Sequence, residues 1–229
     1  MSILIRRSCM ILLALPVAAL ADPVAVTTHS TGTSTVDNTI LSALGLNSVA
    51  TTAPLPYELT LRSTFDPGSD PLWPPGWAYD FDSEVVIDFR IGSQVYHYDG
   101  TANSSVNRVS VSIFDSYEHN IWFTTAGPPD ANYTVHFHNR LYDLPGSMGL
   151  GGPLTPFDAN ESSGENVFGY YTINATPSNP DVPLSWSMQG PPATLSVHVA
   201  VVPEPASFVL LAAGLLTLGL RRRFGRVPM

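Results

Sequence analysis

Apolar and polar residues alternate at every second position in several runs of this chain, and this pattern constrains the fold more than any other feature. In the run 85–91, four apolar residues share one face: Val85, Ile87, Phe89 and Ile91. The opposite face carries Asp88 and Arg90. Side chains point to alternate faces of a strand, so a period of two predicts a strand with one buried face.

The same alternation recurs along the chain, with segments rich in proline and glycine between the runs. The predicted strands cover residues 57–62, 85–91, 109–113, 120–125, 133–140, 167–174, 184–188 and 194–201. In the last strand the residues expected to face inward are Leu195, Val197, Val199 and Val201. Short strands separated by turn signals are typical of sandwiches and jelly-rolls. We therefore predict one all-β domain, an antiparallel β-sandwich or jelly-roll.

Helical periodicity is confined to one stretch. Residues 36–48 predict a short helix, with Asp37 or Asn38 as its N-cap. Two long segments rich in proline, glycine and serine, 67–79 and 144–164, are predicted to be loops.

The N-terminal segment has the three parts of a secretory signal peptide. Arg6 and Arg7 supply a positive region, and residues 9–20 are almost wholly apolar. Ala19 and Ala21 are the small residues that a cleavage site requires. We predict that residues 1–21 are a signal peptide, and that the exported domain covers residues 22–201.

The C-terminal segment also has three parts, within residues 202–226. Pro203, Glu204 and Pro205 come first, followed by fifteen uncharged residues, 206–220. The chain then carries an arginine cluster, made of Arg221, Arg222, Arg223 and Arg226. As a helix the uncharged segment would span about 22 Å, which suits a short membrane anchor. Arginines on one side only predict a transmembrane helix whose C-terminal end is cytoplasmic.

This tail resembles the PEP-CTERM sorting signal of Gram-negative bacteria, and a plain single-span anchor is the alternative. The resemblance implies that an exosortase-type enzyme processes the chain near Pro203, Glu204 and Pro205. It implies transient anchoring in the inner membrane, and then a place at the cell surface, in the outer envelope or in the extracellular matrix. It also implies a link to exopolysaccharide and biofilm.

The charge of the exported part restricts its partners. Residues 22–202 hold eighteen acidic residues against four arginines, a formal charge of −14, and the whole chain has no lysine. Such a domain is a poor ligand for polyanions, so we expect no nucleic-acid partner. The one cysteine, Cys9, lies in the signal peptide. The exported domain therefore has no disulfide and no thiol nucleophile.

Two groups of residues suggest metal binding, and each has a simpler explanation. Asp80, Asp82 and Glu84 fall on one face of a predicted strand and could hold calcium, although a solvated sheet edge explains them as well. His136 and His138 also share a strand face, together with Thr134. They could bind zinc if His97, His119 or Asp143 joined them, but a polar outer face is the simpler interpretation. We predict no cofactor, with calcium as the alternative.

No motif of an enzyme class is recognisable, so the prediction is a non-enzymatic surface or matrix protein. Trp73 and Trp77 lie in a predicted proline-rich loop, where exposed aromatic rings can stack on sugars. Other aromatic candidates for such stacking are Trp122, Trp186, Tyr96, Tyr98, Tyr170 and Tyr171. A glycan-binding module of the matrix is therefore one alternative. A secreted hydrolase with scattered catalytic residues is another.

Overall fold

The computed structural model describes residues 22–66, 76–111, 114–127, 131–143, 151–162, 168–178 and 186–202. Among them, ten strands form one antiparallel sheet in the order β7-β10-β1-β2-β3-β4-β5-β6-β8-β9. The elements are β1 (Val24–Ser34), α1 (Asn38–Ala43), β2 (Leu55–Phe65), β3 (Trp77–Ile91), β4 (Gln94–Val111), β5 (Phe114–Gly127), β6 (Ala131–Asp143), β7 (Phe157–Ser162), β8 (Phe168–Pro177), β9 (Trp186–Gly190) and β10 (Pro192–Val201).

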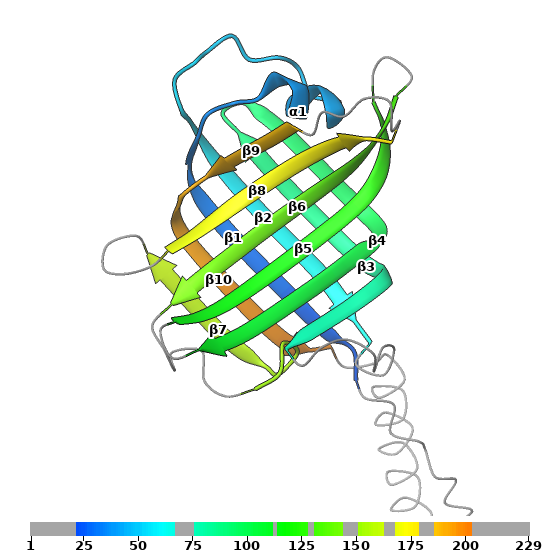
Figure 1. The fold of residues 1–229 in the computed structure, drawn as a ribbon, viewed down its shortest axis with the longest axis vertical. Coiled ribbons are helices and arrows are strands. Elements are labelled where there is room, and N and C mark those ends of the chain that lie inside the picture. Colours follow the sequence, from blue (N-terminus) through cyan, green and yellow to red (C-terminus); the bar gives the residue numbers. More distant parts are fainter. Residues whose placement is uncertain are drawn as a thin grey trace, which may run out of the picture.

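The sheet curls on itself until β9 reaches β1, with β8 and β9 crossing in front of β1 (Figure 1). The Ser34 hydroxyl of β1 donates a hydrogen bond of 3.0 Å to the carbonyl of Gln189 in β9. At Gly190 a Cβ atom would lie 2.8 Å from the Thr33 carbonyl oxygen, so this approach requires glycine. The all-β, antiparallel, single-domain prediction is confirmed. The two walls belong to one sheet rather than to a sandwich or jelly-roll, because long strands accumulate enough twist to fold a sheet on itself.

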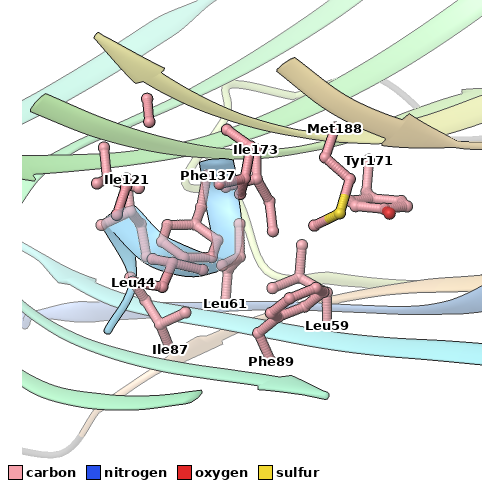
Figure 2. Close-up of a cluster of buried hydrophobic side chains, with 14 of the residues drawn as sticks. Leu44, Leu59, Leu61, Ile87, Phe89, Ile121, Phe137, Tyr171, Ile173 and Met188 are labelled. Carbon is pink, nitrogen blue, oxygen red and sulfur yellow. The ribbon is translucent and has the colours of Figure 1, made fainter. Parts of the chain in front are cut away.

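Two apolar clusters fill the space between the walls. The larger cluster includes Leu59 and Leu61 of β2, which face Phe137 of β6 and Ile173 of β8 across the interior (Figure 2). Helix α1 lies at this end of the curled sheet and contributes Ile40, Leu41 and Ala43 to the larger cluster. The smaller cluster lies toward the chain ends; its buried residues are Val24, Val26, Phe65, Val106, Tyr117, Leu141, Leu195, Val197 and Val199.

A layer of buried polar side chains separates the two clusters. Along β5 the inward residues run from apolar Tyr117 to polar His119 to apolar Ile121, and β2, β4 and β6 repeat this sequence. We call this the polar layer; its members, each at most 1% exposed, are Thr28, Ser30, Ser63, Ser104, His119 and Asn139. Because they come from β1, β2, β4, β5 and β6, they join opposite walls of the sheet.

Hydrogen bonds connect every member of the polar layer. The His119 ring lies at the centre, with Nδ1 3.1 Å from the Thr28 hydroxyl and Nε2 2.7 Å from the Ser63 hydroxyl. Asn139 donates to Thr28 and accepts from Ser30, at 3.1 and 2.9 Å. Ser104 donates to Ser63 at 2.6 Å. Burial lowers the pKa of His119 to about 3, so the ring is neutral at pH 7.

The strand faces follow the predicted alternation with one exception. Val85, Ile87, Phe89 and Ile91 are buried, as are Leu195, Val197 and Val199. Val201 is 45% exposed, so its predicted inward position is wrong. It is the last residue of β10, where the interior ends.

The two predicted loops are too long, and two strands, β1 and β7, have no counterpart among the predicted strands. β3 begins at Trp77, inside the predicted loop 67–79, and β7 occupies part of the predicted loop 144–164. The sequence pattern did not indicate β1, because its inward positions include polar Thr28 and Ser30. The pairing of β3 with β2 ends at Glu84, so among the described residues 77–83 pair on one side only, with β4. Asp82 and Glu84 are exposed, so the expected solvated sheet edge at Asp80–Glu84 is confirmed.

The short helix is confirmed, with a cap at the predicted residue. The Asp37 carboxylate accepts hydrogen bonds from the backbone amides of Thr39 and Ile40, at 2.7 and 3.4 Å. Within the described residues, no helix has the length and apolar character needed to cross a membrane. The predicted signal peptide, 1–21, and the predicted membrane segment, 206–220, lie outside the described residues.

Burial of His119 makes stability depend on pH. The unfolded chain protonates this ring below its ordinary pKa of 6.5, whereas the folded protein excludes the proton down to about pH 3. The free energy of unfolding should therefore fall as the pH drops from 6.5 toward 3. Relative to His119→Gln, the wild-type protein should lose up to about 1.4 kcal/mol more per pH unit. Urea unfolding of both proteins at several pH values measures this, and equal slopes would contradict it.

Candidate functional site

The outer face of β3, β4, β5, β6 and β8 carries the richest chemistry of the described residues. The strand register aligns outward side chains in rows across these strands. One row runs Trp77, Asn107, Glu118, Arg140 and Tyr170. The next row runs Tyr79, Ser105, Asn120, His138 and Thr172. Polar groups at the centre of this face are therefore flanked by aromatic rings.

The rings form a continuous band across the strands, which we call the aromatic band. Tyr79 and Trp122 have ring centroids 5.2 Å apart, and those of Trp122 and His136 are 5.8 Å apart. The band continues from His136 to His138 at 5.9 Å and from His138 to Tyr170 at 5.4 Å. Contacts of this length fix the rings relative to one another, so the surface they present is preorganised.

A hollow of about 430 Å³ opens in this face. Its lining residues are Trp77, Ser105, Glu118, Asn120, Trp122, Thr134 and His136. Ser105 and Asn120 are only 3% and 8% exposed, whereas Trp77 is 38% exposed. The polar groups thus lie deeper than the tryptophan ring, an arrangement suited to a ligand with an apolar surface and several hydroxyl groups.

Glu118 and Arg140 form the ion pair of the site. Arg140 Nη2 lies 2.9 Å from Glu118 Oε1, and Nη1 donates to the Tyr170 hydroxyl at 3.2 Å. The Arg140 guanidinium also lies 4.4 Å from the centre of the Tyr142 ring. Burial raises the pKa of Glu118, and the charge of Arg140 opposes this rise. The arginine therefore holds a carboxylate in place at the hollow.

The histidines of this face are neutral hydrogen-bonding groups at pH 7. His136 Nε2 lies 2.9 Å from the Asn120 amide oxygen. Burial lowers the pKa of His136, and it lowers the pKa of His138 to about 3 with help from the neighbouring charges. Neither ring therefore adds positive charge to the hollow.

Three buried polar atoms of this face have no hydrogen-bond partner among the described residues. They are Asn107 Oδ1, His138 Nε2 and Arg140 Nε. Asn107 is only 5% exposed, and it lies opposite Trp77 in the strand register. A buried polar atom without a partner costs about 1–3 kcal/mol. Their residues pair in register with Glu118 or Asn120, which line the hollow, but they do not line it themselves.

The histidines predicted as metal ligands lie on different faces of the sheet. His136 and His138 do share a face with Thr134, as predicted. His119 projects from the opposite face into the polar layer, and His97 lies 2.7 Å from Asp88. Among the described residues, no three histidine, cysteine or acidic side chains lie close enough to hold a metal ion.

The predicted sugar-stacking residues separate into different environments. Trp77, Trp122 and Tyr170 lie on the outer face, whereas Tyr171 is fully buried and Tyr96 and Tyr98 pack against the larger cluster. Trp73 lies outside the described residues, as do Pro203–Pro205 and the arginines Arg221, Arg222, Arg223 and Arg226. No sequence motif indicated Glu118 or Asn120, although both alternate with Trp122 along one strand and so share its face.

A serine and a histidine do meet at hydrogen-bond distance, but away from the surface. Ser63 Oγ lies 2.7 Å from His119 Nε2, a spacing suited to a nucleophile and its base. Both residues are 0% exposed, and the other ring nitrogen faces Thr28 rather than a carboxylate. A substrate cannot reach this pair in the folded protein, so its role is structural.

Comparison with known proteins concerns the C-terminal segment. Residues 201–223 match the family model of the PEP-CTERM protein-sorting motif. The predicted sorting motif is thereby confirmed, and it indicates export, membrane anchoring and processing by an exosortase-type enzyme. A search of curated proteins and a search of solved structures each found no match.

The Glu118–Arg140 pair provides a test of the site's electrostatics. Arg140→Met should lower the free energy of unfolding at pH 7 by about 1–3 kcal/mol, because it leaves the largely buried Glu118 carboxylate unpaired. Solvent contact with the pair keeps this loss below that of a fully buried ion pair. Without Arg140, burial keeps the pKa of Glu118 above its unfolded value, so the loss should shrink as the pH falls. Glu118→Gln in the same chain should restore part of the stability. Urea unfolding measures all three proteins, and a double variant no more stable than Arg140→Met would contradict this account.

Proposed function

We propose that this chain, which carries a PEP-CTERM sorting motif at its C-terminal end, is a non-enzymatic protein of the cell surface or extracellular matrix. An exosortase-type system delivers it there, and its partner is the exopolysaccharide of the biofilm matrix. The observation that carries the proposal is the match of residues 201–223 to the sorting motif.

The way the folded domain meets the sorting motif supports this proposal. Val201, the first matched residue, pairs with Val24 at the start of β1. The backbone amide of Val202 also donates to the Pro23 carbonyl at 2.7 Å. The beginning and the end of the exported domain therefore lie side by side. In the precursor, both ends of the domain would face the membrane, and the opposite end with α1 would face outward.

The chemistry of the domain supports a binding role rather than a catalytic one. The Ser63–His119 pair is sealed inside the sheet, whereas the hollow of the outer face carries fixed rings and hydrogen-bonding groups. The exported part also has a formal charge of −14, which favours solubility and repels polyanions. Such a domain can persist outside the cell and hold a neutral matrix component.

Deleting Pro203–Pro205 tests delivery. The deletion should leave the full-length chain in the inner membrane, because the processing enzyme loses its recognition motif. Immunoblots of membrane, envelope and medium fractions measure the change in size and location. Val95→Ala is the matched control, since Val95 is 56% exposed and lies in β4, remote from the motif in sequence. Normal processing and release of the deletion variant would overturn the sorting proposal.

A further inference from the structure

We propose that the hollow between Trp77 and Trp122 binds a pyranose ring of a neutral polysaccharide. This inference rests on the proposed function for the source of the polymer, and on the geometry of the outer face for the site itself. It goes further by naming the residues that bind and the chemical class of the ligand.

The size and openness of the hollow suit a polysaccharide. The hollow of about 430 Å³ lies in the lower part of the roughly 300–1,000 Å³ range of small-molecule sites. It is open to solvent, and Trp77 in its lining is 38% exposed. An open hollow lets a polymer continue beyond the ring that occupies it. A chain of sugars therefore fits better than an enclosed small molecule.

The aromatic rings supply the apolar contact. A pyranose ring has one face of C–H groups, which carry partial positive charge, and aromatic faces carry partial negative charge. Trp122 is held between Tyr79 and His136, so its orientation costs little entropy on binding. Trp77 begins β3 and lies on the same face. The two tryptophans thus offer stacking surfaces around one hollow.

The polar groups suit the hydroxyls of a sugar. Glu118 Oε1 is fixed by Arg140, and Glu118 Oε2 lies 3.9 Å from His138 Nε2, too far for a strong hydrogen bond. This second oxygen can accept a hydrogen bond from a sugar hydroxyl. Asn120 and Thr134 complete the polar lining.

Charge selects a neutral polymer over an acidic one. The positive charge of Arg140 is offset by Glu118 at 2.9 Å, and burial keeps His136 uncharged at pH 7. The exported part as a whole has a formal charge of −14. A uronate or sulfate group would therefore meet repulsion without a free cation at the hollow, whereas a neutral sugar would not.

Binding to defined oligosaccharides tests the inference. The full chain in detergent is titrated with maltohexaose, cellohexaose, laminarihexaose, oligogalacturonate and the exopolysaccharide of the producing cells. Tryptophan fluorescence and calorimetry should detect at least one neutral ligand and no oligogalacturonate. Trp77→Ala should weaken that binding roughly tenfold or more, and Glu118→Gln should weaken it as well. Trp77→Phe, which keeps a ring, should retain most of it, and Val95→Ala should match the wild type.

The controls separate loss of binding from loss of folding. Each variant is first compared with the wild type by thermal unfolding, and Trp77→Phe reports on the site if Trp77→Ala does not fold. The inference is overturned if no neutral ligand binds, or if folded Trp77 and Glu118 variants bind as tightly as the wild type. Stronger binding of oligogalacturonate would also overturn it. The Pro203–Pro205 deletion tests sorting in a separate experiment. The binding proposal can therefore be overturned while the sorting proposal is confirmed, and the sorting proposal can be overturned while the binding proposal is confirmed.

Discussion

The polar layer around His119 is the constraint on which the rest of this structure depends. Its six side chains come from five strands and connect opposite walls of the curled sheet. A slip of one residue in any of these strands would turn its polar member outward and leave partners unsatisfied. Each unsatisfied group costs about 1–3 kcal/mol, against a typical domain stability of about 5–15 kcal/mol. The layer therefore fixes the register of the walls, while the two apolar clusters supply most of the stabilisation by burial.

The same register builds the outer face. On β5, His119 and Ile121 point inward, so Glu118, Asn120 and Trp122 must point outward. The neighbouring strands then place Asn107 and Arg140 beside Glu118. Arg140 holds the carboxylate, and the aromatic band runs across the same face. The candidate binding surface is thus a consequence of the internal polar layer, because both are set by the same alternation.

Much of the fold could be predicted from the pattern of single strands. The alternation in β2, β3 and β10 identified most of their buried faces, and Asp37 was recognisable as a helix cap. β1 was not predicted, because polar Thr28 and Ser30 occupy inward positions. Apolar residues at these positions would have completed the alternation that indicates a strand. The single curled sheet was not predicted either. Alternation shows which face of a strand is buried, but it does not show which other strands pack against that face. Of the candidate site, Trp77 could be chosen as an aromatic residue near prolines, but Glu118 and Asn120 gave no signal alone.

By itself, the sequence determined that the chain is exported, carries a PEP-CTERM sorting motif and forms a single acidic all-β domain. These properties depend on residues close together in the chain or on composition, so they can be read without a fold. Only the tertiary structure decided that Ser63 and His119 meet in a sealed interior, and that Trp77, Glu118 and Trp122 surround one hollow. These groups come from different strands, and their proximity depends on strand order, register and curl. Those three quantities arise from contacts between distant segments, which no local pattern encodes.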